Sequence, residues 1–236
     1  MRRAIVWEIV RKDLAELRGN RYVWSSIFVL PVFLLLDSTL TATSAGSGSG
    51  TGLLIGSSLL LLTPALISVV IAAPGIVQEK TNKSLEPLLA TPISDTELLW
   101  GKAVAPLIPA LAANYLSFTA FILLVDSIAT SAGHAPPLPN VAVLFDMFVA
   151  GTLLGFLATF ATLIISSRMK DVRTAQQFSM LVVLPVFVAV VAVIAFVGDT
   201  PAALIAVSGV LLLAVASVAR LAEKTFHRST ILVNWV

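Results

Sequence analysis

The sequence predicts an all-α integral membrane protein with six transmembrane helices and with both termini in the cytoplasm. Hydrophobic residues make up 58% of the 236-residue chain and charged residues only 12%, which leaves little from which to build a soluble domain. Several uncharged stretches are long enough to cross a bilayer as a helix, which takes about 20 apolar residues. All 15 Lys and Arg residues lie in four clusters that these stretches separate.

The basic clusters predict the orientation of the chain. Basic residues near the ends of membrane helices are retained on the cytoplasmic side. Because a cluster lies at each end of the chain, the number of crossings is even and both termini are cytoplasmic. The clusters are Arg2, Arg3, Arg11, Lys12, Arg18 and Arg21; Lys80, Lys83 and Lys102; Arg168, Lys170 and Arg173; and Arg220, Lys224 and Arg228.

The uncharged intervals place the crossings at about residues 21–42, 53–77, 103–126, 145–167, 175–198 and 200–219. Residues 38–52 are rich in Gly and Ser, which predicts a flexible outer loop. Prolines inside the crossings are expected to bend or interrupt their helices; they are Pro64, Pro74, Pro106, Pro109 and Pro185.

Residues 4–18 precede the first crossing and have an amphipathic pattern. Trp7, Val10, Leu14 and Leu17 recur at helical spacing on one face, and charged residues lie elsewhere. This pattern predicts a helix in the cytoplasmic interface of the membrane. The alternative is a surface helix that packs on the protein's own loops.

Residues 79–100, a cytoplasmic loop between the second and third crossings, are predicted to begin with a short helix. Ser84 is a suitable N-cap, and Glu86 complements the helix dipole in the first turn. Thr91 and Pro92 should end this helix, because the residue before a proline avoids helical geometry.

A second helix is predicted to start within the same loop. Ser94 and Glu97 have the spacing of a capping box, which opens a helix into the third crossing. Leu85, Leu88 and Leu89 give the short first helix an apolar face, but this helix is too short to cross a bilayer. A separate cytoplasmic protein is the expected partner of that face.

This loop resembles the cytoplasmic loop of permease subunits in the ABC type-2 exporter family. Lys83 stands where the family usually has glycine, and Ser84 stands where it usually has threonine, which preserves the N-cap. The residues that match the family pattern are Glu79, Lys80, Leu85, Glu86, Leu88, Leu89, Thr91, Pro92, Gly101 and Lys102.

The resemblance covers essentially the whole chain and implies a non-catalytic permease subunit. Such a subunit pairs with a second permease, identical or different, and with two cytoplasmic ABC ATPase subunits. The family's short loop helix docks on the ATPase and transmits its closure. ATP and Mg would be bound by the ATPase partners; the chain itself lacks the Gly-rich pattern followed by Lys and Ser or Thr that cradles phosphates.

Polar and small residues in the crossings could line a path or pack helices together. Asn114 lies near the middle of the third crossing with Ser117 close by, and Gly151 and Gly155 are four residues apart. Small residues at this spacing let helices approach closely, and a buried amide needs a partner, so both interpretations stay open. No charged residue lies near the centre of a crossing, which disfavours a proton-coupled or cation-coupled carrier.

A metal site and a nucleic-acid interface are not indicated. The chain has no Cys, and His134 and His227 stand alone in sequence, without a cluster of ligands. Asp126 and Asp146 bracket an outer loop and are interpreted as solvated helix ends rather than as a cation site. Topology and contact with anionic lipid account for the basic residues.

The function expected from the sequence is that of an ABC exporter permease in the plasma or inner membrane. Apolar crossings that carry hydroxyl groups favour a lipophilic or amphipathic substrate. Two alternatives stay open: a membrane carrier or channel that does not use ATP, and a membrane scaffold or sensor that does not transport.

Overall fold

The computed structural model describes residues 3–19, 21–44, 50–81, 93–197 and 200–225, and these segments contain helices but no strand. Six helical segments within them are long and apolar enough to cross a membrane, which confirms the all-helical class with six candidate spans. The elements are α1 (Arg3–Gly19), α2 (Arg21–Ser44), α3 (Gly50–Leu60), α4 (Leu62–Thr81), α6 (Asp95–Ser131), α7 (Val141–Phe145), the π-helix η1 (Asp146–Ala150), α8 (Gly151–Arg168), α9 (Val172–Val197) and α10 (Pro201–Thr225).

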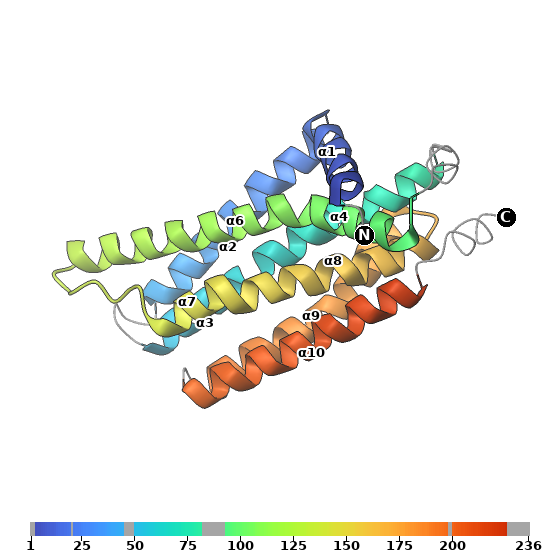
Figure 1. The fold of residues 1–236 in the computed structure, drawn as a ribbon. Coiled ribbons are helices and arrows are strands. Elements are labelled where there is room, and N and C mark those ends of the chain that lie inside the picture. The colour runs from blue at the N-terminus through green and yellow to red at the C-terminus, as the bar shows by residue number, and fades with distance from the viewer. Residues whose placement is uncertain (1–2, 20, 45–49, 82–92, 198–199, 226–236) are drawn as a thin grey trace.

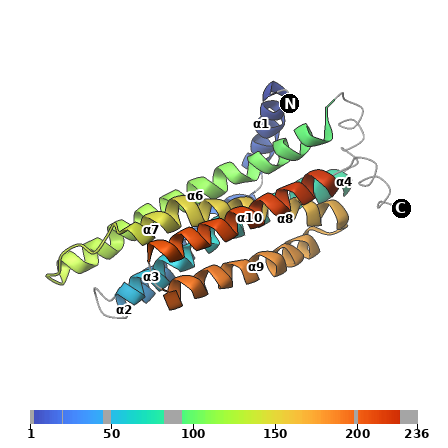
Figure 2. The same cartoon turned by 60° about the horizontal axis from the view of Figure 1, so that its bottom comes forward.

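The spans lie side by side as a bundle, and α1 lies across one end of it (Figures 1 and 2). The second span is formed by α3 and α4, and the fourth by α7, η1 and α8. These two spans are buried over most of their length, and α4 packs most extensively on α8. The other four spans expose many large apolar side chains, such as those of Phe33, Leu116 and Phe196, as expected of surfaces that face lipid.

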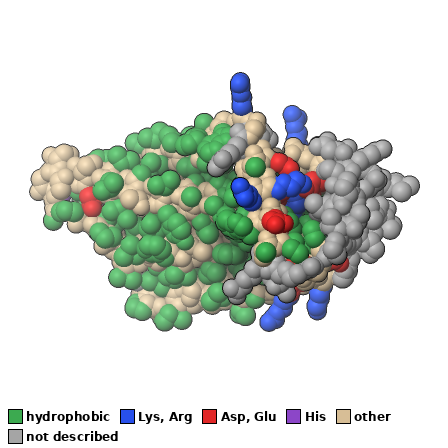
Figure 3. Space-filling view, turned by 45° about the horizontal axis from the view of Figure 1, so that its top comes forward, with side chains coloured by type: hydrophobic (Ala, Val, Ile, Leu, Met, Phe, Trp, Pro, Cys, Tyr) green, Lys and Arg blue, Asp and Glu red, His purple; other side chains and the backbone are tan. Residues whose placement is uncertain are grey.

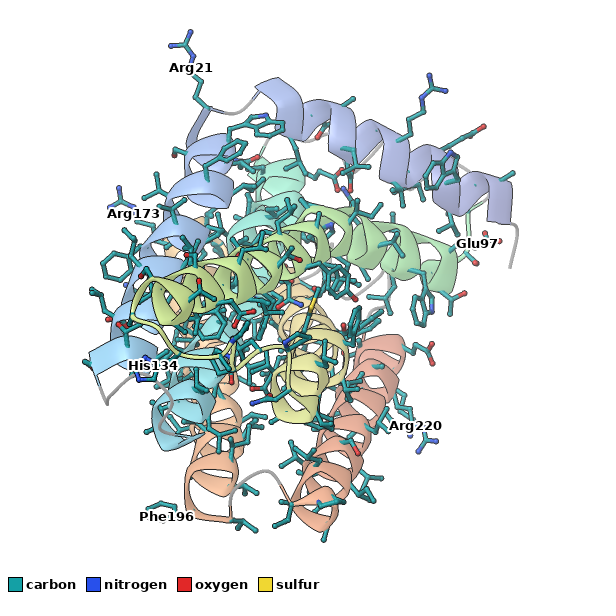
Figure 4. All side chains as sticks on the ribbon, turned by 90° about the vertical axis from the view of Figure 1, so that its left-hand side faces the viewer. Arg21, Glu97, His134, Arg173, Phe196 and Arg220 are labelled. Atoms are coloured by element: carbon teal, nitrogen blue, oxygen red, sulfur yellow. The ribbon has the colours of Figure 1, made fainter. Side chains whose placement is uncertain are left out.

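Lys and Arg side chains gather at one end of the bundle, whereas hydrophobic side chains cover its length (Figure 3). We call this the basic end; it comprises α1, the start of α2, the end of α4, the start of α6, the turn between α8 and α9, and the end of α10. The opposite end is the distal end. Viewed from the distal end, Arg21 and Arg220 point away from the bundle (Figure 4).

The second span is interrupted at Leu61, between α3 and α4. Pro64 has no N–H with which to bond the carbonyl oxygen of Leu60. Close to this gap, the Leu61 N–H bonds the carbonyl oxygen three residues earlier, that of Ser58, at 3.2 Å. Prolines inside α2, α4, α6 and α9 lie in continuous helices. Among the described helices, the predicted interruption is therefore found only beside Pro64.

The outer loop predicted over residues 38–52 is wrong for most of its length, since α2 continues to Ser44 and α3 begins at Gly50. Residues 45–49 lie outside the described residues. The hydroxyls of Thr39 and Thr43 donate to the carbonyl oxygens four residues earlier, at 2.7 and 2.9 Å. Such bonds satisfy polar side chains within a helix, so a Ser- and Thr-rich sequence can remain helical where water is scarce.

Helix α6 begins with the predicted capping box. The Glu97 N–H donates to Ser94 Oγ at 3.2 Å, and the Ser94 N–H donates to Glu97 Oε2 at 3.1 Å. The helix has 37 residues, about 55 Å at 1.5 Å per residue, whereas the hydrocarbon core is about 30 Å thick. It therefore reaches beyond the hydrocarbon, and its first turns lie beside α1 at the basic end (Figure 1).

We expect Gly56→Ala to lower the melting temperature of the purified protein. A Cβ at Gly56 would lie 2.7 Å from the Ser38 carbonyl oxygen and 3.0 Å from Ala42 Cβ, so α2 and α3 would have to separate, at about 1–3 kcal/mol. The matched control is Gly209→Ala in α10, where a Cβ meets nothing within 4 Å and alanine improves helix propensity. Equal melting temperatures for the two variants would contradict close α2–α3 packing.

Candidate functional site

A buried group of three charged residues joins three helices at the basic end. Lys102 of α6 is 5% exposed. Its Nζ lies 2.7 Å from Glu79 Oε1 of α4 and 3.1 Å from Asp13 Oδ1 of α1. We call Asp13, Glu79 and Lys102 the ion cluster. It fixes the relative positions of α1 and of the two helices that flank the predicted coupling loop.

A second lysine adds a weaker tie at the surface. Lys12 Nζ lies 3.5 Å from Glu79 Oε1 and 3.6 Å from Glu16 Oε1, with 46% of the lysine side chain exposed. Exposed ion pairs contribute little because water and salt screen them. Of these two lysines, the buried Lys102 therefore contributes most of the electrostatic attraction among α1, α4 and α6.

The two carboxylates of the ion cluster do not bind Lys102 equally. Burial raises the pKa of Asp13, and the attraction of Lys102 offsets this only in part. Glu79 is also the nearer partner, at 2.7 Å against 3.1 Å. Against the effect of burial, Asp13 and Glu79 both raise the pKa of Lys102, and Asp13 is the carboxylate whose protonated form burial favours.

The residue before Lys102 allows α1 to approach. A Cβ at Gly101 would lie 2.8 Å from Ile9 Cγ2, so a larger residue would push α1 away from α6. Ile9 and Val10 are both buried at this contact. Gly101 and Lys102, the Gly-Lys pair of the family pattern, therefore act together: the glycine admits α1, and the lysine binds its carboxylate.

The same stretch of α6 also contacts α8 and α10. The Trp100 ring packs edge-on against Phe160 of α8, with ring centroids 5.3 Å apart, and its Nε1–H donates to Glu223 Oε1 of α10 at 3.4 Å. The first turns of α6 thus touch four other helices of the basic end.

The predicted apolar face of α1 is buried only in part: Val10 is buried and Leu14 and Leu17 are half-buried, whereas Trp7 is exposed. The helix itself forms, but Trp7 is 61% exposed while Ile9 and Val10 are buried. The contact with α6 is centred beside Asp13, which sequence analysis missed. The available signal was its spacing, since Asp13 lies three residues after Val10 and four before Leu17, on the same side of a helix. Placement of α1 in the membrane interface stays a prediction.

The predicted ATPase-coupling residues lie mostly outside the described residues. Glu79 belongs to the ion cluster, and Lys80 lies in α4 with its side chain not described. The described chain stops at Thr81 and resumes at Ile93, next to the capping box. The predicted coupling residues outside the described part are Ser84, Leu85, Glu86, Leu88, Leu89, Thr91 and Pro92.

Asn114 and Gly151, two of the candidate path or packing residues, are brought together. The Asn114 Nδ2–H donates to the Met147 carbonyl oxygen in η1 at 3.0 Å, and a Cβ at Gly151 would lie 2.7 Å from Asn114 Oδ1. Asn114 is fully buried. This is the geometry that a helix-packing role requires.

The other two candidates lie apart from that pair. A Cβ at Gly155 would meet Pro64 Cβ at 3.4 Å, which is ordinary packing between α8 and α4. Ser117 is 4% exposed and borders an apolar groove of about 430 Å³ between α2 and α6. Whether any of the four lines a path stays a prediction.

The interpretation of Asp146 as a solvated helix end is wrong. Asp146 is 1% exposed, because α3 packs over it and Ser57 Oγ lies 2.8 Å from its Oδ2. Asp126 is half-buried, and its Oδ1 accepts a hydrogen bond from the Leu138 N–H at 3.0 Å. Within the described residues, no group of three His, Cys, Asp or Glu side chains could hold a metal ion.

Six helices long and apolar enough to cross a membrane define the class of a multi-pass membrane protein. The family model of the ABC-2 family transporter proteins matches residues 26–216. The chain therefore belongs to the ABC-2 transporter family, whose members are transmembrane permease subunits and generally not catalytic. Comparison with curated proteins gave no match.

We expect Lys102→Met to destabilise the protein strongly. The variant leaves Asp13 and Glu79 buried without their cation, and removing one member of a buried pair costs about 3–5 kcal/mol. Thermal unfolding of the purified chain measures the loss. Lys12→Met removes an exposed ion pair and should lower the free energy of unfolding by less than about 1 kcal/mol. The loss for Asp13→Asn should lie between those of Lys12→Met and Lys102→Met. A loss for Lys102→Met no larger than that for Lys12→Met would contradict the role of the ion cluster.

Proposed function

We propose that this chain is the permease subunit of an ABC exporter and that it couples a transmembrane path to separate ATPase subunits. The complete transporter contains a second permease, as a homodimer or heterodimer, and two cytoplasmic ATPases that bind ATP and Mg. Membership of the ABC-2 transporter family is the observation that carries this proposal.

We also propose that the basic end faces the cytoplasm of the cell and that both termini lie on that side. Lys and Arg gather at this end of the bundle, as the retention of basic residues on the cytoplasmic side requires. The end of α4 and the start of α6, which flank the predicted coupling loop in sequence, lie at the same end.

The orientation can be tested by labelling single cysteines, because the native chain has none. Lys170 and His134 are exposed at opposite ends of the bundle. In intact cells, we expect an impermeant thiol reagent to label His134→Cys but not Lys170→Cys, and permeabilisation should make both reactive. Asn82→Cys should behave as Lys170→Cys. Labelling of Lys170→Cys or Asn82→Cys from outside would overturn the proposed orientation.

Movement of the loop would reach both α4 and α6, since it connects them directly. The ion cluster extends that connection to α1, because Lys102 binds carboxylates on α4 and α1. ATPase closure would therefore shift α1, the end of α4 and the start of α6 together. The contact of Glu79 with Lys102 supports a coupling role for Glu79, in addition to the coupling role proposed for the residues of the short loop helix.

A groove among α2, α4 and α9 supports an amphipathic substrate. Its volume is about 640 Å³, and apolar residues such as Val69 and Met180 line much of it. Ser25, Ser26 and Gln177 add hydroxyl and amide groups on the side nearer the basic end. A compound with an apolar body and a polar head fits such a lining.

The coupling role predicts the effect of charges in the short loop helix. Replacing Leu88 and Leu89 with Asp should abolish co-purification with the ATPase, because an apolar docking face would carry two charges. Membrane insertion should be unchanged. A matched control is Lys224→Asp, which adds negative charge at an exposed position of the basic end. Normal co-purification of the Leu88 and Leu89 double variant would overturn the docking role.

A second variant separates docking from transmission. Asp13→Asn should leave the ATPase bound and lower the stimulation of ATP hydrolysis by transported compounds several-fold, since α1 is then tied less firmly to Lys102. A partner ATPase whose hydrolysis responds to neither set of variants would instead favour a scaffold or sensor. Transport that continues without any ATPase would favour a carrier or channel.

A further inference from the structure

Asp146 is a buried carboxyl that the coupling site does not use. It is the first residue of η1 in the distal half of the fourth span. The residue is 1% exposed, and its neighbour Ser57 on α3 is fully buried. Ser57 Oγ lies 2.8 Å from Asp146 Oδ2, so the contact joins the second and fourth spans.

Ser57 has two close oxygen partners but only one proton. Its Oγ lies 2.8 Å from Asp146 Oδ2 and 3.1 Å from the Leu54 carbonyl oxygen. The carbonyl oxygen can only accept, and an ionised carboxylate can only accept as well. A protonated Asp146 satisfies both contacts, because its Oδ2–H donates to Ser57 Oγ while the Ser57 hydroxyl donates to Leu54.

The surroundings of Asp146 provide no compensating positive charge in the described part of the chain. Helices α6, α7, α8 and α10 pack against η1, and α3 packs against α7. Asp126 and Tyr115 are the titratable groups of these helices in the distal half, and they bind the Leu138 N–H and the Thr152 hydroxyl. His134, in the turn after α6, is exposed. The other charged groups of these helices lie at the basic end: Asp95, Glu97, Lys102, Arg168, Arg220, Glu223 and Lys224.

The backbone holds the carboxyl in this position. The Gly151 N–H bonds the Asp146 carbonyl oxygen across one turn of the π-helix. Asn114 Nδ2–H bonds the next carbonyl oxygen, that of Met147. These two bonds fix the backbone from which the Asp146 side chain projects. π-Helical turns are frequent at functional sites.

We propose that Asp146 is a proton-binding site and that its bound proton joins α3 to η1 at the distal end of the bundle. The neutral carboxyl donates to Ser57 and needs no cation. Loss of the proton to water leaves an anion among apolar neighbours, which is costly, and the Ser57 hydroxyl must then donate to the carboxylate instead of to Leu54. A free aspartic acid ionises at about pH 4, so the folded chain retains a proton that the unfolded chain has lost, and the stability that this junction contributes falls as the pH rises above about 4. This inference does not depend on the transport function.

Infrared difference spectroscopy of the purified full chain tests the proposal. At pH 7, the spectrum of the wild type minus that of Asp146→Asn should contain the C=O stretching band of a protonated carboxyl. The band should disappear on alkaline titration, and the melting temperature should fall as the pH rises above about 4. Asp126→Asn is the matched control, since Asp126 accepts a backbone N–H and its removal should leave the band in place. A difference spectrum without the band would overturn the proposal.

Stability gives a second readout. An amide at position 146 can donate to Ser57 as the neutral acid does but releases no proton on unfolding, so Asp146→Asn should melt above the wild type at pH 7 and should lose the fall in melting temperature that the wild type shows as the pH rises above about 4. A melting temperature as low as that of Asp146→Ala would contradict a proton donor at this position. If Asp146→Asn does not fold, Ser57→Ala keeps the carboxyl and should shift its band; an unshifted band would equally overturn the proposal.

Discussion

Polar groups that are buried among apolar helices must find their partners inside the protein, and this constraint determines how the bundle is assembled. A lysine as buried as Lys102 is tolerated only with anionic partners, and it takes them from two other helices, Glu79 on α4 and Asp13 on α1. These three helices must therefore come together as a unit. The same requirement acts at the distal end, where Asp146 meets Ser57 and Asn114 meets the backbone of η1.

These polar contacts at the two ends of the bundle are directional, whereas the apolar packing in its middle is not. The middle of the bundle is held by apolar side chains of α4 and α8 and their neighbours, and burial of apolar area is a non-directional force. Apolar surfaces can shift relative to one another at modest cost, whereas a buried ion pair or hydrogen bond has one favourable geometry. On the proposed function, the loop between α4 and α6 would thus move the basic end as one piece, and the apolar middle would accommodate the shift.

Features that depend on local pattern could be predicted from the sequence. The six spans follow from uncharged intervals, and the capping box at Ser94 and Glu97 follows from spacing alone. Features that depend on tertiary contact could not. Asp146 stands at the end of an apolar interval and looks solvated, but α3 covers it. The role of Asp13 depends on which face of α1 meets α6, and of the apolar residues predicted on one face Trp7 is exposed while Val10 is buried.

Helix α1 lies outside the residues matched by the family model, 26–216, yet the ion cluster makes it part of the same structural unit. Gly101 and Lys102 explain how. The glycine removes the side chain that would collide with Ile9, and the lysine then reaches Asp13 at 3.1 Å. Neither residue is sufficient: without the glycine the helices stand too far apart for the ion pair, and without the lysine two carboxylates face each other. A Gly-Lys pair at the start of α6 is therefore a structural requirement for docking α1.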